Sequence, residues 1–382
     1  MRVLLITSSF PTTFDPIAGN FVESQIEGLR KRGVQVDVVA LNIFSFRKVV
    51  KWMLFRLKYS GLTGNKCFFT ASFINIFPFG AWFHQFWFRF MTQIAVKKYI
   101  KRHDVPDLIH AHFGLWAGYS ASQCGLVDKV PLLITEHSSI YYENNVSKVE
   151  SRSANLAVNT AGRFCVPSSF LKEVIAKQMP FTCEKLTVIP NFVNSLFFNA
   201  THDQQRENVL ISIGRLVADK GFETVIKSFA KMKNRKNYNL IIVGDGTDYK
   251  ALKKLSLECE LYDNIHFTGI LNSQEISNLL KKSKILVSCS HFETFGMTIV
   301  ESLATGTPVL VTNVGAPKGF VSTKVGEVCK VKDVEDTSSK LDYMIDNYSK
   351  YDHASIREFA LSHFGEEVVL NNIFNEYKSL IR

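Results

Sequence analysis

The stretch HFETFGMTIVES, residues 291–302, carries two glutamates, Glu293 and Glu301, on either side of a Phe-Gly pair that we expect to be exposed. Glu293 follows an apolar run typical of a strand, and Glu301 falls inside a helical pattern. Eight residues of helix span at most about 12 Å, which is wide for a hydrolytic pair of carboxylates at about 5–9.5 Å. The spacing favours hydrogen bonds to the two ends of one extended ligand. In the alternative interpretation both glutamates are solvated, or Glu293 caps the helix.

The expected helix, 296–305, begins between the two glutamates and ends at Gly306, which Pro308 follows. Unpaired N–H groups and a partial positive charge at its N-terminus suit a phosphate. Gly296 would let a ligand approach the backbone closely. A ligand with hydroxyl groups at each glutamate and phosphates between them has the layout of a nucleotide sugar.

Two cations, Arg215 and Lys220, follow another strand-like run in SIGRLVADKGF. Together they can neutralise a diphosphate and stabilise it as it leaves, although each alone is ordinary surface charge. Glycine turns with Gly244 and Gly315 come after two further runs. The first is not a full dinucleotide fingerprint, because Tyr249 stands where the last glycine belongs.

Three histidines also follow strand-like runs. His110 and His112 alternate in IHAHFG and therefore point to one face of a strand. A metal site would need further ligands, and no cysteine or acidic cluster nearby supplies them. We expect His110 to be packed or hydrogen-bonded and His112 to face a ligand cleft. For His137, in ITEHSS, the alternative to a ligand-binding role is a structural one.

Short apolar runs alternate with helical patterns along the chain, as in parallel sheets covered by helices on both faces. The expected strands are 2–9, 34–41, 107–113, 131–137, 163–168 and 185–191, then 208–214, 238–246, 264–269, 284–290, 307–313 and 326–331. The polar segment 194–208 is expected to be a linker. The pattern predicts an α/β chain of two Rossmann-like, doubly wound domains, 1–195 and 205–365, facing across a cleft, with a helix over 366–381 packed back on the first. Ligands of such sheets bind at the carboxyl ends of the strands.

Composition and charge narrow the class of protein. Of the 382 residues, 46% are hydrophobic and 21% charged, which is typical of folded chains rather than disordered ones. The net charge of +10 suits an anionic partner, and no nucleic-acid recognition module is visible. Seven cysteines without a C-x-x-C pair indicate buried thiols in a reducing compartment such as the cytoplasm. No run reaches the roughly 18 uncharged apolar residues of a membrane span, and the N-terminus is interpreted as a strand rather than a signal peptide.

HFETFGMTIVE resembles the E-x7-E element of the retaining GT-B glycosyltransferases called glycosyl transferases group 1, or family 4. SIGRLVADKG is similar to their donor-phosphate motif, and VGDG, HFTG and VIPN follow in the family's order. FPTTFDPIAGNFVESQIEGLRKRGVQVDVV resembles their opening strand, glycine loop and first helix. The resemblance covers nearly the whole chain. Three short motifs differ: the first loop has one glycine (Gly19) instead of two, IPNFVN replaces I-P-N-G-V-D, and VGAP replaces G-G-x-P.

The resemblance implies roles for the candidate residues. Glu293 would contact the transferred sugar near the reacting carbon, Glu301 the ribose, and Arg215 with Lys220 the diphosphate, while His137 would lie near sugar and acceptor. It also implies contacts from the backbone at Thr294, Phe295, Gly296 and Met297 to sugar and phosphate, from Ile270 to the base, from Gly19 to phosphate and sugar, and from Asn191 and Gly315 to the sugar. His112 and Gly244 complete the predicted substrate-binding set.

Residues 44–103 mix aromatic and basic side chains densely. This composition is typical of a segment at a membrane interface, with rings at the headgroups and Lys or Arg on phosphate. It is equally typical of an aromatic helical flank, expected over 82–103, that packs on the first sheet. Either interpretation places the segment in the domain expected to bind the acceptor.

These observations predict a retaining glycosyltransferase that moves a sugar from a nucleotide-diphosphate sugar to a glycan or lipid-linked glycan, in bacterial surface polysaccharide synthesis. We expect no cofactor and no obligate metal, because Arg215 and Lys220 supply positive charge. Expected partners are the nucleotide sugar, the acceptor and the cytoplasmic face of a membrane, without nucleic acid. The alternatives are a nucleotide-sugar epimerase and a catalytically silent subunit that binds a partner glycosyltransferase.

Overall fold

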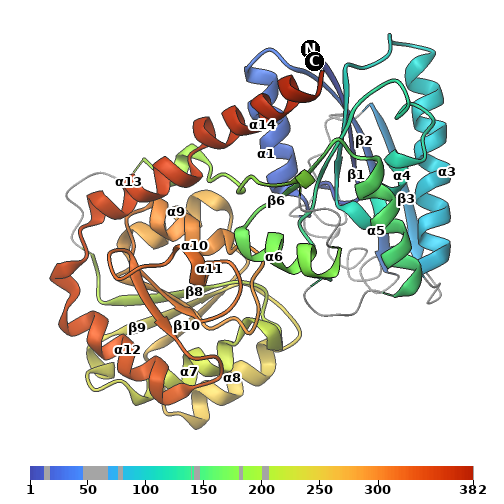
Figure 1. Ribbon diagram of the computed structural model, residues 1–382. Helices are drawn as coiled ribbons and strands as arrows, with labels where there is room; N and C mark the ends of the chain where they lie inside the picture. Colours follow the sequence, from blue (N-terminus) through green and yellow to red (C-terminus); the bar gives the residue numbers. More distant parts are fainter. Residues whose placement is uncertain are drawn as a thin grey trace. The chain divides into compact units, whose positions relative to one another are not determined.

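A computed structural model describes residues 1–12, 18–45, 68–75, 81–138, 140–141, 147–179, 184–199 and 206–381. The chain divides into two compact units, each built on one parallel sheet (Figure 1). Unit 1 comprises Met1–Ile189 together with Leu370–Arg382, and unit 2 comprises Pro190–Val369.

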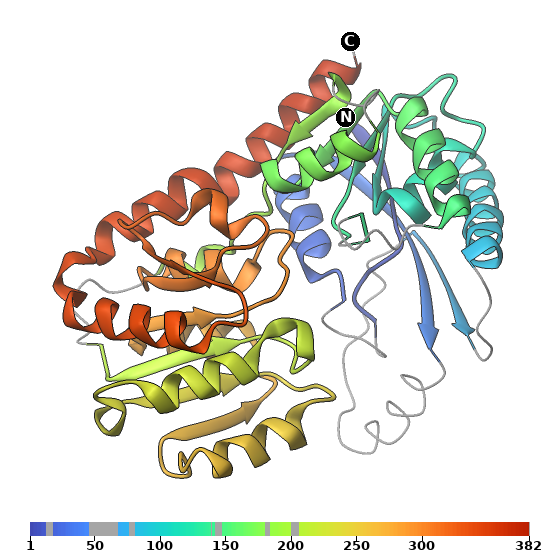
Figure 2. The same ribbon diagram turned by 60° about the horizontal axis from the view of Figure 1, so that its bottom comes forward.

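The sheet of unit 1 has the strand order β3-β2-β1-β4-β5-β6-β7, with parallel pairing throughout. Its strands are β1 (Arg2–Thr7), β2 (Gln35–Ser45), β3 (Phe69–Asn75), β4 (Leu108–His112), β5 (Leu132–Thr135), β6 (Arg163–Val166) and β7 (Leu186–Val188). Helices α1 (Asn20–Lys31) and α14 (Glu366–Ile381) cover one face, and α3 (Ala81–Ile100), α4 (Tyr119–Ser122), α5 (Lys148–Thr160) and α6 (Ser169–Gln178) cover the other (Figures 1 and 2).

The faces follow from the alternation of side chains along each strand. Leu4, Ile6 and Ile109 belong to the apolar core beneath α3, α5 and α6. The neighbouring residue His110 points to the opposite face and meets α14, where its Nδ1 lies 2.6 Å from Tyr377 Oη. α14 also runs along α1, since Arg32 Nη1 donates to Asn371 Oδ1 at 2.7 Å (Figure 1).

The sheet of unit 2 has the order β10-β9-β8-β11-β12-β13, again parallel. Its strands are β8 (Val209–Ile213), β9 (Asn239–Val243), β10 (Ile265–Gly269), β11 (Ile285–Ser288), β12 (Val309–Thr312) and β13 (Gly326–Cys329). The helices are α7 (Phe222–Lys231), α8 (Tyr249–Glu258), α9 (Ser273–Lys282), α10 (Met297–Ala304), α11 (Pro317–Phe320), α12 (Val334–Asp346) and α13 (His353–Phe364). α7 packs against both α8 and α12, and α10 packs against both α9 and α13.

The expected strands are all present, and all but β2 are one to several residues shorter than their apolar runs. Arg215, Gly244, Ile270 and Glu293 therefore lie in the loops that follow the strands, whereas His112 is the last residue of β4 and Glu301 lies in α10. The elements that were not expected include β3 and α5. β3 forms the edge of the first sheet, and α5 begins at a capping box in which Ser147 and Glu150 satisfy each other's backbone N–H groups.

The expected linker begins instead with a single 3-10 turn, Ser195–Phe197, whose Phe197 is buried in the core of unit 2. Arg206 fastens the other end of that segment, because its guanidinium donates to the carbonyls of Leu280, Ser283 and Thr305. Within the described parts of the chain, no helix is both long and apolar enough to cross a membrane.

Candidate active site

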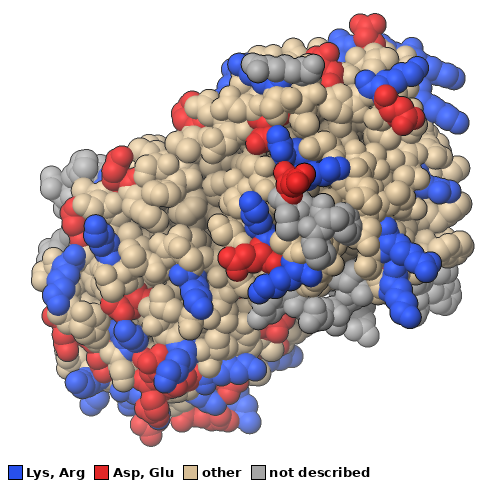
Figure 3. Space-filling model, in the orientation of Figure 1, with Lys and Arg blue, Asp and Glu red and all other residues tan. Residues whose placement is uncertain are grey.

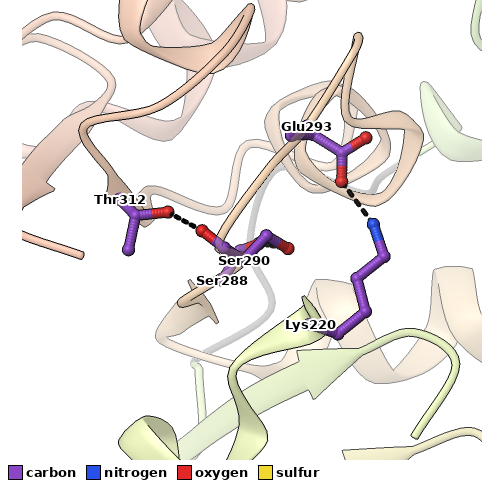
Figure 4. A network of polar contacts seen from close by, with 5 residues as sticks. All are labelled: Lys220, Ser288, Ser290, Glu293 and Thr312. Atoms are coloured by element: carbon purple, nitrogen blue, oxygen red, sulfur yellow. Dashed lines mark hydrogen bonds and ion pairs between the residues drawn. The ribbon is translucent and has the colours of Figure 1, made fainter. Parts of the chain in front are cut away.

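Lys220 and Glu293 meet at the carboxyl edge of the second sheet (Figure 4). Lys220 ends the turn after β8, Glu293 lies in the loop after β11, and the ammonium Nζ is 2.6 Å from Glu293 Oε2. β8 and β11 are neighbours in the sheet, which explains how residues 73 positions apart come together. Both side chains remain partly exposed, so a ligand can reach either group.

The Glu293 loop is held by close backbone packing. Gly315 has φ +61°, and a Cβ there would lie 1.8 Å from the Glu293 carbonyl oxygen. The same carbonyl accepts a hydrogen bond from Ala316 N at 3.0 Å. His291 N donates to Asp219 O at 2.7 Å and ties this loop to the Lys220 turn. Behind it, Thr312 Oγ1 donates to Ser290 O at 2.5 Å (Figure 4). Gly315 thus supports Glu293 sterically, a role that needs no side-chain or backbone contact with a ligand.

Glu301 lies on α10, half-buried. Across the described ranges its carboxylate has no recorded hydrogen bond or ion pair, and burial raises its pKa to about 8. A carboxyl group in this position can donate or accept a hydrogen bond. It is therefore a suitable partner for a hydroxyl-bearing ligand that excludes water from it.

The residues between the two glutamates form the start of α10. Gly296 is the N-cap with φ +92°, and Met297 opens the helix. The expected exposure of the Phe-Gly pair is wrong: Phe295 is only 4% exposed, because its ring packs on Phe320 and Phe364 at centroid distances of 6.4 and 5.7 Å. Thr294 and Met297 are half-buried, so the groups that a ligand can reach here are the backbone and these two side chains.

Other predicted residues line the same sheet edge. Arg215 follows β8 with an exposed side chain, and Ile270 follows β10 and is 65% exposed. Gly244 follows β9 with φ +135°, and a Cβ there would lie 1.9 Å from Gly214 O. Gly244 therefore lets two adjacent loops pack together. Asn191 is half-buried and lies near the start of unit 2, after β7 of the first sheet rather than after a strand of the second.

In unit 1 the histidines form a chain of contacts. His112 Nδ1 lies 3.0 Å from His137 Nε2, and the two rings are parallel at 5.3 Å. His112 Nε2 and His137 Nδ1 are both buried, and no hydrogen-bond partner is recorded for either among the described residues. Burial lowers the pKa of His112 to about 3, and burial followed by the neighbouring His112 lowers that of His137 well below its usual range. Both imidazoles are therefore neutral at pH 7.

The structure places His112 behind His137. His112 has no exposed surface, whereas His137 is half-buried. We therefore assign His112 to orienting the His137 ring rather than to touching a substrate. His110 is hydrogen-bonded as expected, since its Nε2 lies 2.8 Å from Thr135 Oγ1 and its Nδ1 meets Tyr377.

Glu136, which sequence reasoning missed, builds the turn that carries His137. The buried carboxylate accepts hydrogen bonds from the N–H groups of His137 and Ser138 at 2.8 Å and of Gly114 at 2.9 Å. It thereby joins the loop after β5 to the π-helical turn Gly114–Gly118 after β4. Phe113, between β4 and that turn, has a strained φ of 75°, and its ring lies 5.3 Å from His137. The adjacent sequence position of Glu136 and His137 was the available signal.

Gly19 completes the predicted set in unit 1. It is the N-cap of α1 with φ +65°, and a Cβ there would lie 2.3 Å from Ser9 O, after β1. Phe21, in the first turn of α1, lies at a ring distance of 4.5 Å from His137. Among the residues that the structure describes, no group of three His, Cys, Asp or Glu side chains could hold a metal ion.

Two protein-family models match adjoining parts of the chain. Glycosyltransferase Family 4 matches residues 18–195, and Glycosyl transferases group 1 matches residues 195–358. An uncharacterized glycosyltransferase of Methanocaldococcus jannaschii is 23% identical over 86% of this chain and 84% of its own length. The O-antigen chain mannosyltransferase RfbU of Salmonella typhimurium is 31% identical over 50% of this chain and 56% of its own.

Solved structures show the same fold. HepE of Anabaena in complex with UDP matches with a TM-score of 0.76 at 18% identity, covering 100% of both chains. The expected α/β architecture of two Rossmann-like domains is thereby confirmed. The chain is an enzyme, a glycosyltransferase of the glycosyl transferases group 1 family with the GT-B fold.

Proposed function

We propose that this enzyme is a retaining glycosyltransferase that moves a sugar from a nucleoside-diphosphate sugar to a glycan or lipid-linked glycan. The observation that carries the proposal is the set of groups at one edge of the second sheet. A Lys220–Glu293 ion pair, the amides at the start of α10 and the half-buried carboxyl of Glu301 follow one another there. These groups match a sugar, a diphosphate and a ribose in that order.

The donor roles follow from the chemistry of each group. Lys220 and Arg215 would neutralise the diphosphate, because cations close to phosphate oxygens stabilise both the bound and the departing form. The N-terminal amides of α10 would add a partial positive charge. Glu301 would bind the ribose hydroxyls and Glu293 the sugar hydroxyls. Ile270, exposed after β10, would lie beside the base. No metal is required in this scheme.

Transfer with retention would take place on one face of the sugar. The bond from the anomeric carbon to the phosphate oxygen breaks, and the acceptor oxygen bonds to the same face of that carbon. The acceptor proton passes to the departing phosphate oxygen. Glu293 would position the sugar and stabilise its developing positive charge without forming a covalent adduct, and His137, neutral and half-buried, would hydrogen-bond sugar or acceptor.

The relatives support a biological role in bacterial surface polysaccharide synthesis, since one of them is an O-antigen chain mannosyltransferase. The same proposal places the enzyme in the cytoplasm and on the cytoplasmic face of a membrane, where a lipid-linked acceptor would be presented. UDP is the favoured nucleotide, because it is bound in the HepE structure.

A thermal-shift panel with UDP, GDP, ADP, dTDP and CMP tests the donor site on the wild type and on Glu301→Ala. A ligand at about a hundred times its dissociation constant adds about 2.7 kcal/mol of stability and moves Tm by a few degrees. One diphosphate should stabilise the wild type and stabilise the variant much less. The absence of any shift at millimolar ligand would overturn the donor assignment. The anomeric configuration of the product, read by NMR, then tests retention.

A further inference from the structure

The outer face of α3 carries a ladder of exposed aromatic side chains. Trp82, Phe86 and Phe90 are 69%, 49% and 48% exposed. Their spacing of four residues puts them on one side of the helix. Successive rings are stacked at centroid distances of 6.2 Å, with interplanar angles of 19° and 7°. The opposite side of the helix is buried against the rest of unit 1, through residues that include Phe88, Ala95 and Tyr99. The three rings of the outer ladder therefore contribute little to the buried core of the unit. An exposed apolar surface of this kind marks an interaction site.

Basic side chains continue the same stripe. Arg89, Lys97 and Lys101 are exposed. At 100° per residue Lys97 falls within the arc of the aromatic ladder, Arg89 lies about 20° beyond one side of it, and Lys101 directly follows the end of the helix. α3 contains no acidic residue. Lys and Arg side chains stand among uncharged residues along the margin of Figure 3 that α3 occupies in Figure 1. The stripe is therefore aromatic toward its N-terminal end and cationic toward its C-terminal end.

The place of α3 in the fold gives this stripe a direction. The helix connects β3 to β4 in a parallel sheet, so Trp82 lies toward the carboxyl edge of the strands and Lys97 toward the opposite edge. On its inner side, His84 and Phe88 contact Trp116 at ring distances of 6.0 and 5.9 Å. Trp116 belongs to the turn that follows His112 and that Glu136 joins to His137. The aromatic end of the stripe and the candidate site of unit 1 therefore share one edge of the sheet.

We propose that the α3 stripe docks the enzyme on an anionic lipid surface, with the Trp82 end in the headgroup layer and the cations on lipid phosphates. Aromatic rings favour that layer, and Lys and Arg near it are attracted by anionic lipid. A second copy of the chain would bring the same cations together and is disfavoured by their repulsion. The inference rests on the proposed function in one respect, since docking in this direction presents the His137 edge to a lipid-linked acceptor.

Co-sedimentation with vesicles of phosphatidylglycerol and phosphatidylcholine tests the surface, with phosphatidylcholine alone for comparison. The wild type should partition to the anionic vesicles at low salt and less at high salt. Replacing Trp82, Phe86 and Phe90 together by serine should weaken partitioning by about tenfold or more. Replacing Arg89 and Lys97 by glutamate should abolish the preference for anionic lipid. Brominated lipid should quench tryptophan fluorescence of the wild type more than that of Trp82→Phe.

Matched controls lie in unit 2. Leu257 and Tyr262 are exposed at 53% and 77%, and their double serine variant should partition like the wild type. Lys250→Glu with Lys253→Glu, on exposed positions of α8, is the charge control. The proposal would be overturned if the control variants lost as much vesicle binding as the α3 variants, or if the wild type did not bind the vesicles. So would a wild-type dimer that the serine variant converts to a monomer, because the stripe would then cover a second copy.

Failure of this inference is separable from failure of the proposed function. Nucleotide binding by the α3 variants should match the wild type, because none of these residues belongs to the donor site. Loss of vesicle binding with unchanged nucleotide binding supports docking alone. Nucleotide binding without any vesicle binding leaves the donor site intact and removes the docking surface.

Discussion

Lys220 Nζ and Glu293 Oε2 lie 2.6 Å apart, so the cation assigned to the diphosphate and the carboxylate assigned to the sugar neutralise each other in the structure. Under the proposed roles, donor binding exchanges this contact for contacts to the ligand. The pair is only partly exposed, which makes the exchange a measurable cost.

Glu293→Gln should therefore separate binding from transfer. Lys220 would be free to meet phosphate, so the nucleoside diphosphate should bind about three- to tenfold more tightly, corresponding to about 1 kcal/mol. Glycosyl transfer should fall by about a hundredfold or more, because the charge beside the reacting carbon is gone. Isothermal titration and turnover assays measure the two effects. Glu223→Gln removes the exposed Lys227–Glu223 pair on α7 and should change neither. Weaker nucleotide binding by Glu293→Gln would contradict the competition.

Glu301 makes the stability of unit 2 depend on pH. Its pKa is about 8 in the folded protein against an ordinary value of 4.5. The folded state thus holds the proton more tightly, and stability falls as pH rises from about 4.5 through 8. Relative to Glu301→Gln, the wild type should lose about 2 kcal/mol over this range, less than the full shift because the side chain keeps some solvent contact. Urea unfolding followed by circular dichroism at several pH values measures the difference. Parallel pH profiles of wild type and variant would be incompatible with a raised pKa.

Gly315→Ala should disturb Glu293 from a distance. The new Cβ would clash with the Glu293 carbonyl at 1.8 Å, and φ +61° disfavours any side chain. We expect a loss of about 2 kcal/mol or more in the free energy of unfolding, with weaker donor binding. Gly319→Ala is the control, because a Cβ at Gly319 meets nothing within 4 Å. Similar effects of the two substitutions would show that Gly315 does not support the loop.

The histidine chain makes unit 1 sensitive to acid. The pKa of His112 is lowered to about 3, and those of His110 and His137 lie well below their usual range, chiefly through burial. The unfolded chain binds these protons near pH 6.5, so stability is present above that pH and is lost as pH falls toward 3, by up to about 1.4 kcal/mol per pH unit for each histidine.

Tryptophan fluorescence can follow this loss in unit 1, because all four tryptophans, at 52, 82, 87 and 116, lie in that part of the chain. His112→Leu should reduce the dependence of stability on pH between 6.5 and 4.5. His363→Leu, at an exposed position of α13, should leave it unchanged. An unaltered slope in His112→Leu would show that His112 titrates alike in the folded and unfolded chain.

The sequence predicts most strands and helices of the second unit. Each strand there is a short apolar run, β8, β9 and β13 are followed directly by a glycine or a charged residue, and parallel strands end at one edge. That rule is enough to gather Arg215, Lys220, Glu293 and Gly315 at the ends of three strands. The helix containing Glu301 was equally clear, since Gly296 precedes it and Gly306 follows it.

Only the tertiary structure decided how these groups meet. The ion pair between Lys220 and Glu293 depends on the adjacency of β8 and β11, which the order of elements along the chain does not state. Phe295 looked exposed because its partners Phe320 and Phe364 are distant in sequence. The only sequence signal for Glu136 is its position next to His137, and Tyr377 has none, because the backbone amides and the histidine that define their roles are brought against them by folding. Local pattern determines which elements form and what lies at their ends, whereas long-range packing determines which of those ends touch.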